Sequence, residues 1–283
     1  MNPILNKKLS PYYNPQTCIV EWLDADSFIC PKRLDIFVKY LYAKSIISGK
    51  DTEYYQKLYL AHIDAFGHFV EKDKIDKVGK TVFLERMDSM VKSIQKDGYN
   101  IESVIPYDIF GIAMDGAHRI AVSAALGIKV PAMQLHGVTN PSYDGQFFRD
   151  RLINLKCLDR ITCEYAKWKD TCRLVYGTSH DESVVKTYGD IVNWKSIKRN
   201  GRIQKVFLVE PFDTKTFIEL KNYPATSQCV SGVFNGDSDV YGFVEWLDII
   251  LSPVTYINYS RRIIILIQFL LFKVRCMIHN KRA

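Results

Sequence analysis

The five consecutive residues from Asp115 to Arg119 have the types and the spacing of an anion-binding loop. They read Asp-Gly-Ala-His-Arg, and an alanine-rich stretch follows them as far as Gly127. Asp-Gly is a turn signal, and small residues closed by a glycine predict a short helix that lies close to a sheet. We therefore expect His118 and Arg119 at a helix N-terminus, where backbone N–H groups attract anions and both side chains can donate charge-assisted hydrogen bonds to phosphate.

An arginine at this position also has a purely structural explanation. Its guanidinium could tie the loop to a nearby carboxylate and contribute only to local stability. The spacing of the residues does not distinguish the two roles, so both stay open for Arg119.

Two apolar runs flank the loop and are expected to position it. The run 110–114 suits a buried strand that leads into the loop, and the run 128–135 suits a strand after the helix. An amphipathic helix and a Pro-containing strand at 104–107 come before them. The helix is predicted from the apolar residues Phe83, Met87, Met90, Val91 and Ile94, which recur at helical spacing before a stop at Asp97-Gly98.

This order of elements and the Asp-Gly-x-His-Arg pattern resemble the ParB/sulfiredoxin fold, whose members include chromosome-partition ParB proteins, sulfiredoxins and free-serine kinases. The resemblance covers roughly residues 66–137. It implies that Asp115, Gly116, Ala117, His118 and Arg119 form a loop that binds the phosphates of a nucleotide. Sulfiredoxins have a catalytic cysteine directly before His-Arg, and the alanine found there in this chain argues against sulfiredoxin chemistry.

The resemblance also implies a catalytic carboxylate in the charged segment before the amphipathic helix. Free-serine kinases carry a catalytic glutamate there, in a segment where His precedes Glu. Glu71 is the nearest match, although two residues separate it from His68, and Asp73 is the alternative. Without the resemblance, alternating acidic and basic residues would indicate a solvated loop.

Composition sets wider limits on the class of protein. A hydrophobic content of 47% with 24% charged residues is typical of a soluble globular protein. The net charge of +7 permits a nucleotide, a membrane surface or a nucleic acid as partner without selecting among them. The seven cysteines include no Cys-x-x-Cys pair, which predicts reduced thiols in the cytoplasm and argues against a zinc ribbon or a disulfide framework. The N-terminus has no apolar run long enough for a signal peptide.

Two helices are expected before the resembling region. Apolar residues recur at helical spacing over 34–47, and again over 51–66 with Asp51 as a possible cap. His62 lies on the apolar stripe of the second helix, where a packed histidine is a better interpretation than a ligand.

The second half of the chain predicts a small domain with its own sheet. The turn signals of 136–145 indicate a domain boundary, and helical spacing over 150–168 is followed by a strand at 173–177. Ser179 and Glu182 fit a capping box, which accounts for the histidine between them. Two further strands are expected at 190–197 and 203–209.

Two features near the C-terminus are open to more than one interpretation. Asp237 and Asp239 resemble a calcium loop but fail the EF-hand pattern, so a polar turn is favoured and a contact with Mg²⁺ or a sugar stays open. The tail 261–283 has an apolar centre between basic residues, and its apolar runs are too short to cross a bilayer. It fits a docked structural helix and a helix on an anionic membrane surface equally well.

Together these observations predict an α+β protein with a ParB/sulfiredoxin-like core. The expected segments are a helical extension at 1–65, the nucleotide-binding core at 66–140, a second α/β or α+β domain at 141–260 and the C-terminal helix at 261–283.

The predicted function is that of a nucleotide-dependent small-molecule kinase that uses ATP or ADP with Mg²⁺, and no residue is assigned as a metal ligand. The layout also resembles proteins of bacterial surface-polysaccharide pathways, which implies a sugar, polyol or amino-acid acceptor. The alternatives are a ParB-like DNA-binding regulator and a non-catalytic nucleotide-binding module. DNA binding is disfavoured because residues 141–210 show strand-like segments where a helix-turn-helix should be. The expected location is the cytoplasm, with a peripheral position at the inner membrane face open through the tail.

Overall fold

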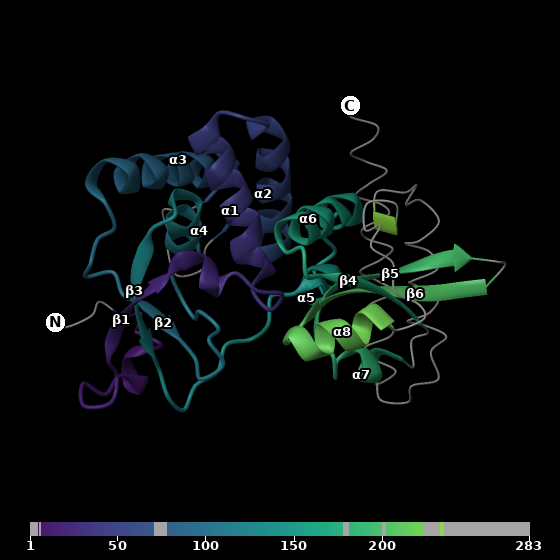
Figure 1. Cartoon of the computed structure of the whole chain (residues 1–283). Helices are drawn as coiled ribbons and strands as arrows, with labels where there is room; N and C mark the ends of the chain where they lie inside the picture. The colour runs from purple at the N-terminus through teal and green to yellow at the C-terminus, as the bar shows by residue number, and fades with distance from the viewer. Residues whose placement is uncertain are drawn as a thin grey trace, which may run out of the picture.

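A computed structural model describes residues 5, 7–70, 78–177, 181–199, 202–222 and 233–234 of the chain. In this part helices pack against two sheets, which confirms the mixed α+β class (Figure 1). Each sheet has three described strands.

The first sheet has the strand order β1-β3-β2. Its strands are β1 (Val20–Asp24), β2 (Ile105–Tyr107) and the central β3 (Lys129–Gln134), which is antiparallel to β1 and parallel to β2. Val130 and Ala132 of β3 face the main hydrophobic core, whereas Met133 faces a smaller cluster with Cys18. Both faces of β3 are therefore covered, which explains its continuous apolar sequence.

Four helices contribute side chains to the main core beside this sheet. They are α1 (Leu34–Ser48), α2 (Thr52–Gly67), α3 (Lys80–Asp97) and α4 (Ala117–Leu126). Helix α1 lies in the middle of the group and is buried on every side from Leu34 to Ala43 (Figure 1). A helix enclosed in this way has few polar positions that reach water, so any charged residue on it needs a partner.

The strands of the second sheet are β4 (Arg173–Gly177), β5 (Gly189–Arg199) and β6 (Arg202–Pro211). Their order is β4-β6-β5, and both strand pairs are antiparallel. The main core extends into this half, because Phe37 of α1 packs 4.9 Å from the ring of Tyr165 and 5.5 Å from that of Trp168. The described helices of this half are α5 (Gly145–Asp150), α6 (Leu155–Trp168), α7 (Glu182–Val185) and α8 (Thr214–Asn222). Two 3₁₀ turns, Ser10–Tyr12 and Ala25–Phe28, lie earlier in the chain.

The strand expected at 110–114 was a wrong prediction. Phe110 is 68% exposed, and the strand that leads toward the loop is β2. The cause is Asp108, whose carboxylate accepts hydrogen bonds from the backbone N–H groups of Phe110 and Ile112, each at 2.9 Å. These two bonds curl the chain into a turn at Gly111 (φ 78°), so the apolar run cannot extend.

Three expected helix starts also differ from the structure. The helix predicted at 150–168 begins only at Leu155, because Asn154 accepts hydrogen bonds from the N–H groups that begin α6. Asp51 precedes α2 in a left-handed conformation and makes no side-chain cap bond. At α7 the N-cap residue is Asp181, and Glu182 instead pairs with Lys186 and Lys205.

Several predicted features lie outside the described residues. They are Glu71 and Asp73, Ser179 and His180, Asp237 and Asp239, and the tail 261–283. Across the ranges that the structure describes, no helix is long and apolar enough to span a membrane. None of the five described cysteines forms a disulfide.

Candidate functional site

The residues from Asp115 to Arg119 lie together at the start of α4, as predicted. Gly116 is the N-cap residue, and no side chain caps the helix start. The first-turn N–H groups of a helix have no acceptor within the helix itself. This end of α4 therefore presents donors and the positive end of the helix dipole to an anion.

Gly116 is required by both its conformation and its surroundings. Its φ of 81° lies in the left-handed region, where only glycine is unstrained. A Cβ atom at this position would lie 2.5 Å from Cδ1 of the buried Ile105 and 3.0 Å from Nη2 of Arg119. Its N–H donates to Oδ1 of Asp115 at 2.6 Å, so the aspartate fixes the turn.

Arg119 is held against the loop that precedes β2. Its Nη1 donates to the carbonyl of Ser103 at 2.9 Å, and the hydroxyl of Tyr99 donates to the same carbonyl at 2.6 Å. Burial raises the pKa of Tyr99, and the positive charge of Arg119 opposes that rise. Among the described residues the guanidinium thus contacts a carbonyl and a phenol, whereas the structural explanation for this arginine required a carboxylate.

His118 is positioned by α2. Its Nε2 lies 3.0 Å from the hydroxyl of Tyr59, a residue whose ring is completely buried. The tyrosine carbonyl in turn lies 2.8 Å from Nδ1 of His62. Burial, together with the nearby charge of Lys39, lowers the pKa of His62 to about 3, so its imidazole is neutral at physiological pH. His62 is packed inside the protein, as its place on the apolar stripe predicted.

A buried ionic network supports the chain that enters the loop. Arg33 donates two hydrogen bonds to the carboxylate of Asp35, at 2.8 and 3.0 Å, and Lys39 donates a third at 2.8 Å. Arg33 also donates to the carbonyl of Ala113, two residues before Asp115, and the side chain of Asn140 donates to that carbonyl at 3.1 Å. Burial alone would raise the pKa of Asp35, but the two cations hold it well below its ordinary value.

These supporting residues were not predicted from the sequence. Asp35 and Lys39 are spaced i, i+4 like a common surface pair, and only their place inside an otherwise apolar helix distinguishes them. Tyr59 was predicted as part of the apolar stripe of α2, but nothing in that stripe indicated that its hydroxyl would reach His118.

The predicted carboxylates Glu71 and Asp73 lie in the segment 71–77, outside the described residues. The residues on either side of that segment are joined, because Val70 and Val78 form a β-bridge and Gly79 N–H donates to the carbonyl of Phe69 at 2.9 Å. Phe69 packs on Phe83, whose carbonyl lies 3.5 Å from the Tyr59 hydroxyl. The described residues that flank the segment therefore pack against α3, and a carbonyl of α3 accepts a hydrogen bond from Tyr59.

Among the described residues, no group of three His, Cys, Asp or Glu side chains is arranged to hold a metal ion. Comparisons of the chain with family models, with curated proteins and with solved structures find no match. The resemblance to the ParB/sulfiredoxin fold and the role of each loop residue therefore stay predictions, and the geometry of the loop is the argument for them.

Proposed function

We propose that this protein is a nucleotide-dependent small-molecule kinase whose loop from Asp115 to Arg119 binds the nucleotide phosphates. The observation that carries the proposal is the uncapped start of α4, where two basic side chains are held in fixed positions beside a glycine. Phosphoryl transfer depends mainly on positioning and on stabilising charge, so helix N–H donors, His118 and Arg119 suit the reaction.

In this proposal Glu71 accepts the proton of the acceptor hydroxyl, with Asp73 as the alternative base. The described residues that flank their segment are joined by a β-bridge between Val70 and Val78, and Phe69 packs on Phe83 of α3. The proposal requires the base to reach the phosphate loop from this segment. Mg²⁺ bound with ATP or ADP would neutralise phosphate charge. Asp115 would orient either the loop or the bound Mg²⁺.

The acceptor class proposed here is a sugar, polyol or amino acid, in a cytoplasmic protein of surface-polysaccharide synthesis. A ParB-like DNA-binding role is less well supported, because residues 173–211 include the antiparallel strands of the second sheet where a helix-turn-helix would be needed. A module that binds a nucleotide without transferring phosphate is the remaining alternative.

The first test is calorimetric titration of the full chain with ATP, ADP and CTP, each with and without Mg²⁺. Replacing Arg119 with Lys keeps the charge but removes the forked contact, and Arg119→Ala removes both. Nucleotide affinity should therefore be highest in the unmodified chain, lower in Arg119→Lys and lowest in Arg119→Ala. Arg160→Ala on α6 is a matched control, because its guanidinium lies over the ring of Tyr54, away from the loop. An absence of heat for all three nucleotides, or equal affinity in all variants, would contradict the proposal.

The second test is phosphate transfer from the nucleotide that binds, screened over sugars, polyols and amino acids. Glu71→Gln should lower turnover by about 10²- to 10⁴-fold with little change in affinity, because a base acts only in the transition state. If Asp73→Asn loses activity instead, the base is Asp73. Binding without transfer to any acceptor would favour the non-catalytic module.

A further inference from the structure

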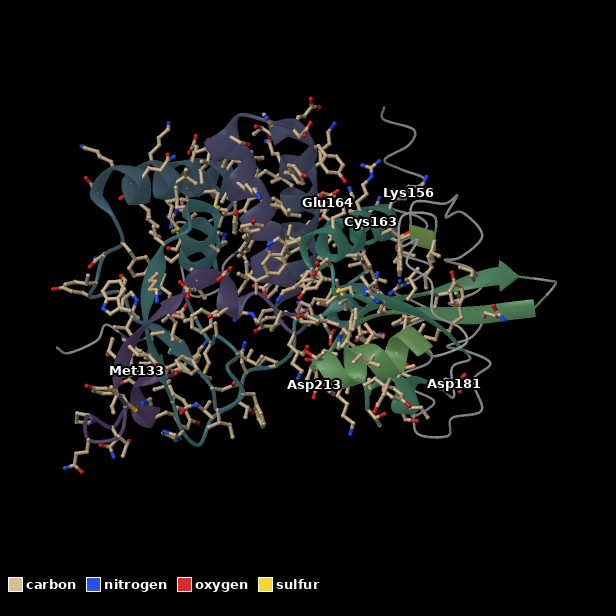
Figure 2. All side chains as sticks on the ribbon, viewed as in Figure 1. Met133, Lys156, Cys163, Glu164, Asp181 and Asp213 are labelled. Carbon is tan, nitrogen blue, oxygen red and sulfur yellow. The ribbon has the colours of Figure 1, made fainter. Side chains whose placement is uncertain are left out.

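A cavity of about 420 Å³ lies on the opposite side of the α1–α2 hairpin from α4. Its walls come from the C-terminal half of α1, the turn before α2, and the last turn of α6. Figure 2 shows Glu164 on α6 beside these two helices, and its Oε2 accepts a hydrogen bond from Tyr55 of α2 at 3.3 Å. The volume lies within the range of small-molecule sites.

One wall of the cavity is aromatic and rigid. The rings of Tyr40 and Trp168 lie 5.9 Å apart, and Phe37 packs behind both, at 6.0 and 5.5 Å. Tyr40 is buried and Trp168 is half-buried. Tyr40 and Phe37 therefore hold Trp168 in place, and Trp168 provides an aromatic surface against which a sugar or a nucleobase can pack.

The charged residues that line the cavity are the lysines Lys44, Lys50 and Lys167 and the carboxylates Asp51 and Glu164, which leaves a surplus of one positive charge. Lys167 lies 2.7 Å from the carboxylate of Glu164, so these two charges cancel. Lys44 lies above the ring of Tyr40 and donates to its hydroxyl at 3.2 Å, and Lys50 begins the turn to α2. In the ranges described, neither Lys44 nor Lys50 forms an ion pair with a carboxylate.

We propose that this cavity binds a small organic phosphate that carries a ring, such as a phosphorylated sugar or a nucleotide. Lys44 and Lys50 would bind the phosphate dianion, and the ring would pack against Trp168. Glu164, already oriented by Lys167 and Tyr55, would accept a hydrogen bond from a ring hydroxyl or amine. This site is separate from the loop at Asp115 to Arg119 and does not depend on the function proposed for that loop.

The test is calorimetric titration of the full chain with glucose 6-phosphate, AMP, inorganic phosphate and glucose. At least one of the two ring-bearing phosphates should bind about tenfold or more tightly than inorganic phosphate and than glucose, because only it engages both the lysines and Trp168. Which of glucose 6-phosphate and AMP binds more tightly identifies the ring.

The double variant Lys44→Gln/Lys50→Gln should weaken that binding about tenfold or more. Lys57→Gln/Lys129→Gln is the charge-matched control, since both lysines are exposed and outside the cavity, and it should leave affinity unchanged. Circular dichroism of both variants checks that the fold is intact. The proposal is overturned if neither ring phosphate binds, if the Lys44/Lys50 variant binds as tightly as the control, or if Arg119→Ala alone abolishes the binding.

Discussion

The hydroxyl of Tyr59 lies 3.0 Å from Nε2 of His118, so the middle of α2 is joined by a hydrogen bond to the second residue of α4. The tyrosine ring is completely buried and stacks on Tyr42, with 4.9 Å between the ring centroids. A side chain packed in this way has little rotational freedom. The imidazole of His118 is therefore oriented by the hydrophobic core, which the phosphate-binding role proposed for it requires.

Tyr59→Phe should weaken nucleotide binding while leaving the fold intact. The variant removes only the hydroxyl, so we expect the free energy of unfolding to fall by about 1 kcal/mol and nucleotide affinity to fall about three- to tenfold. Urea denaturation and calorimetric titration measure the two effects. Tyr54→Phe is the control, because that ring packs on Tyr55 instead of contacting the loop. If affinity is unchanged in Tyr59→Phe, the hydroxyl does not position His118 for binding.

Gly116→Ala and Gly127→Ala form a matched pair at the two ends of α4. Both glycines have a left-handed φ, 81° and 68°, but a Cβ at Gly127 would meet nothing within 4 Å. The strain of φ should cost each variant about 1 kcal/mol. Gly116→Ala should cost about 1 to 2 kcal/mol more, because Ile105 is fully buried and has little room to move.

Nucleotide titration should distinguish the two variants by their affinity as well. Gly116→Ala displaces the guanidinium of Arg119 and should reduce affinity about tenfold or more, whereas Gly127→Ala should bind as the unmodified chain does. Equal affinity and equal unfolding midpoints for the two variants would mean that a glycine is needed at position 116 only for its positive φ, and not to leave room for Ile105 and Arg119.

Asp35→Asn should be among the most destabilising single substitutions in the chain. It removes the negative charge that lies between Arg33 and Lys39, both of which are buried and both of which donate to that carboxylate. Breaking a buried ionic network of this kind typically costs about 3 to 5 kcal/mol. Glu53→Gln breaks an exposed pair with Lys57 and should leave the urea midpoint almost unchanged, so a similar effect of both variants would contradict the argument.

Asp35 should also make the fold sensitive to strong acid. Its pKa is lowered in the folded protein, so the stability that it contributes is present above its ordinary pKa of 3.8 and is lost as the pH falls below that value. A urea midpoint measured from pH 5 to pH 2 should fall less steeply in Asp35→Asn than in the unmodified chain.

The helices of the first half could be predicted because their apolar spacing and closing glycines agree with their packing. The loop at Asp115 to Arg119 was predicted for the same reason, since a turn, small residues and Gly127 all indicate one helix. The run 110–114 was wrongly predicted because the turn depends on Asp108, a single buried carboxylate that periodicity does not detect. The contacts of Arg33 with Ala113 and of Tyr59 with His118 join residues far apart in the chain, and local pattern contains no information about such pairs.

His62 should make the fold lose stability in mild acid. In the unfolded chain this imidazole binds a proton below its ordinary pKa of 6.5, whereas in the folded chain burial and Lys39 lower the pKa to about 3. The unfolded state therefore binds more protons between these two values, and stability falls as the pH is lowered through that window. One such group contributes a slope of up to about 1.4 kcal/mol per pH unit.

The measurement is the free energy of unfolding in urea at half-unit steps from pH 7 to pH 5, a range in which most carboxylates stay ionised. His62→Asn removes the titrating ring and keeps an amide that can donate to the carbonyl of Tyr59. The free energy of unfolding of this variant should therefore fall less steeply with decreasing pH, by about the slope that one titrating group contributes. His68→Asn removes a histidine that is 76% exposed and should keep the slope of the unmodified chain. If His62→Asn retains that slope in full, the imidazole of His62 is not the group that makes the fold sensitive to acid.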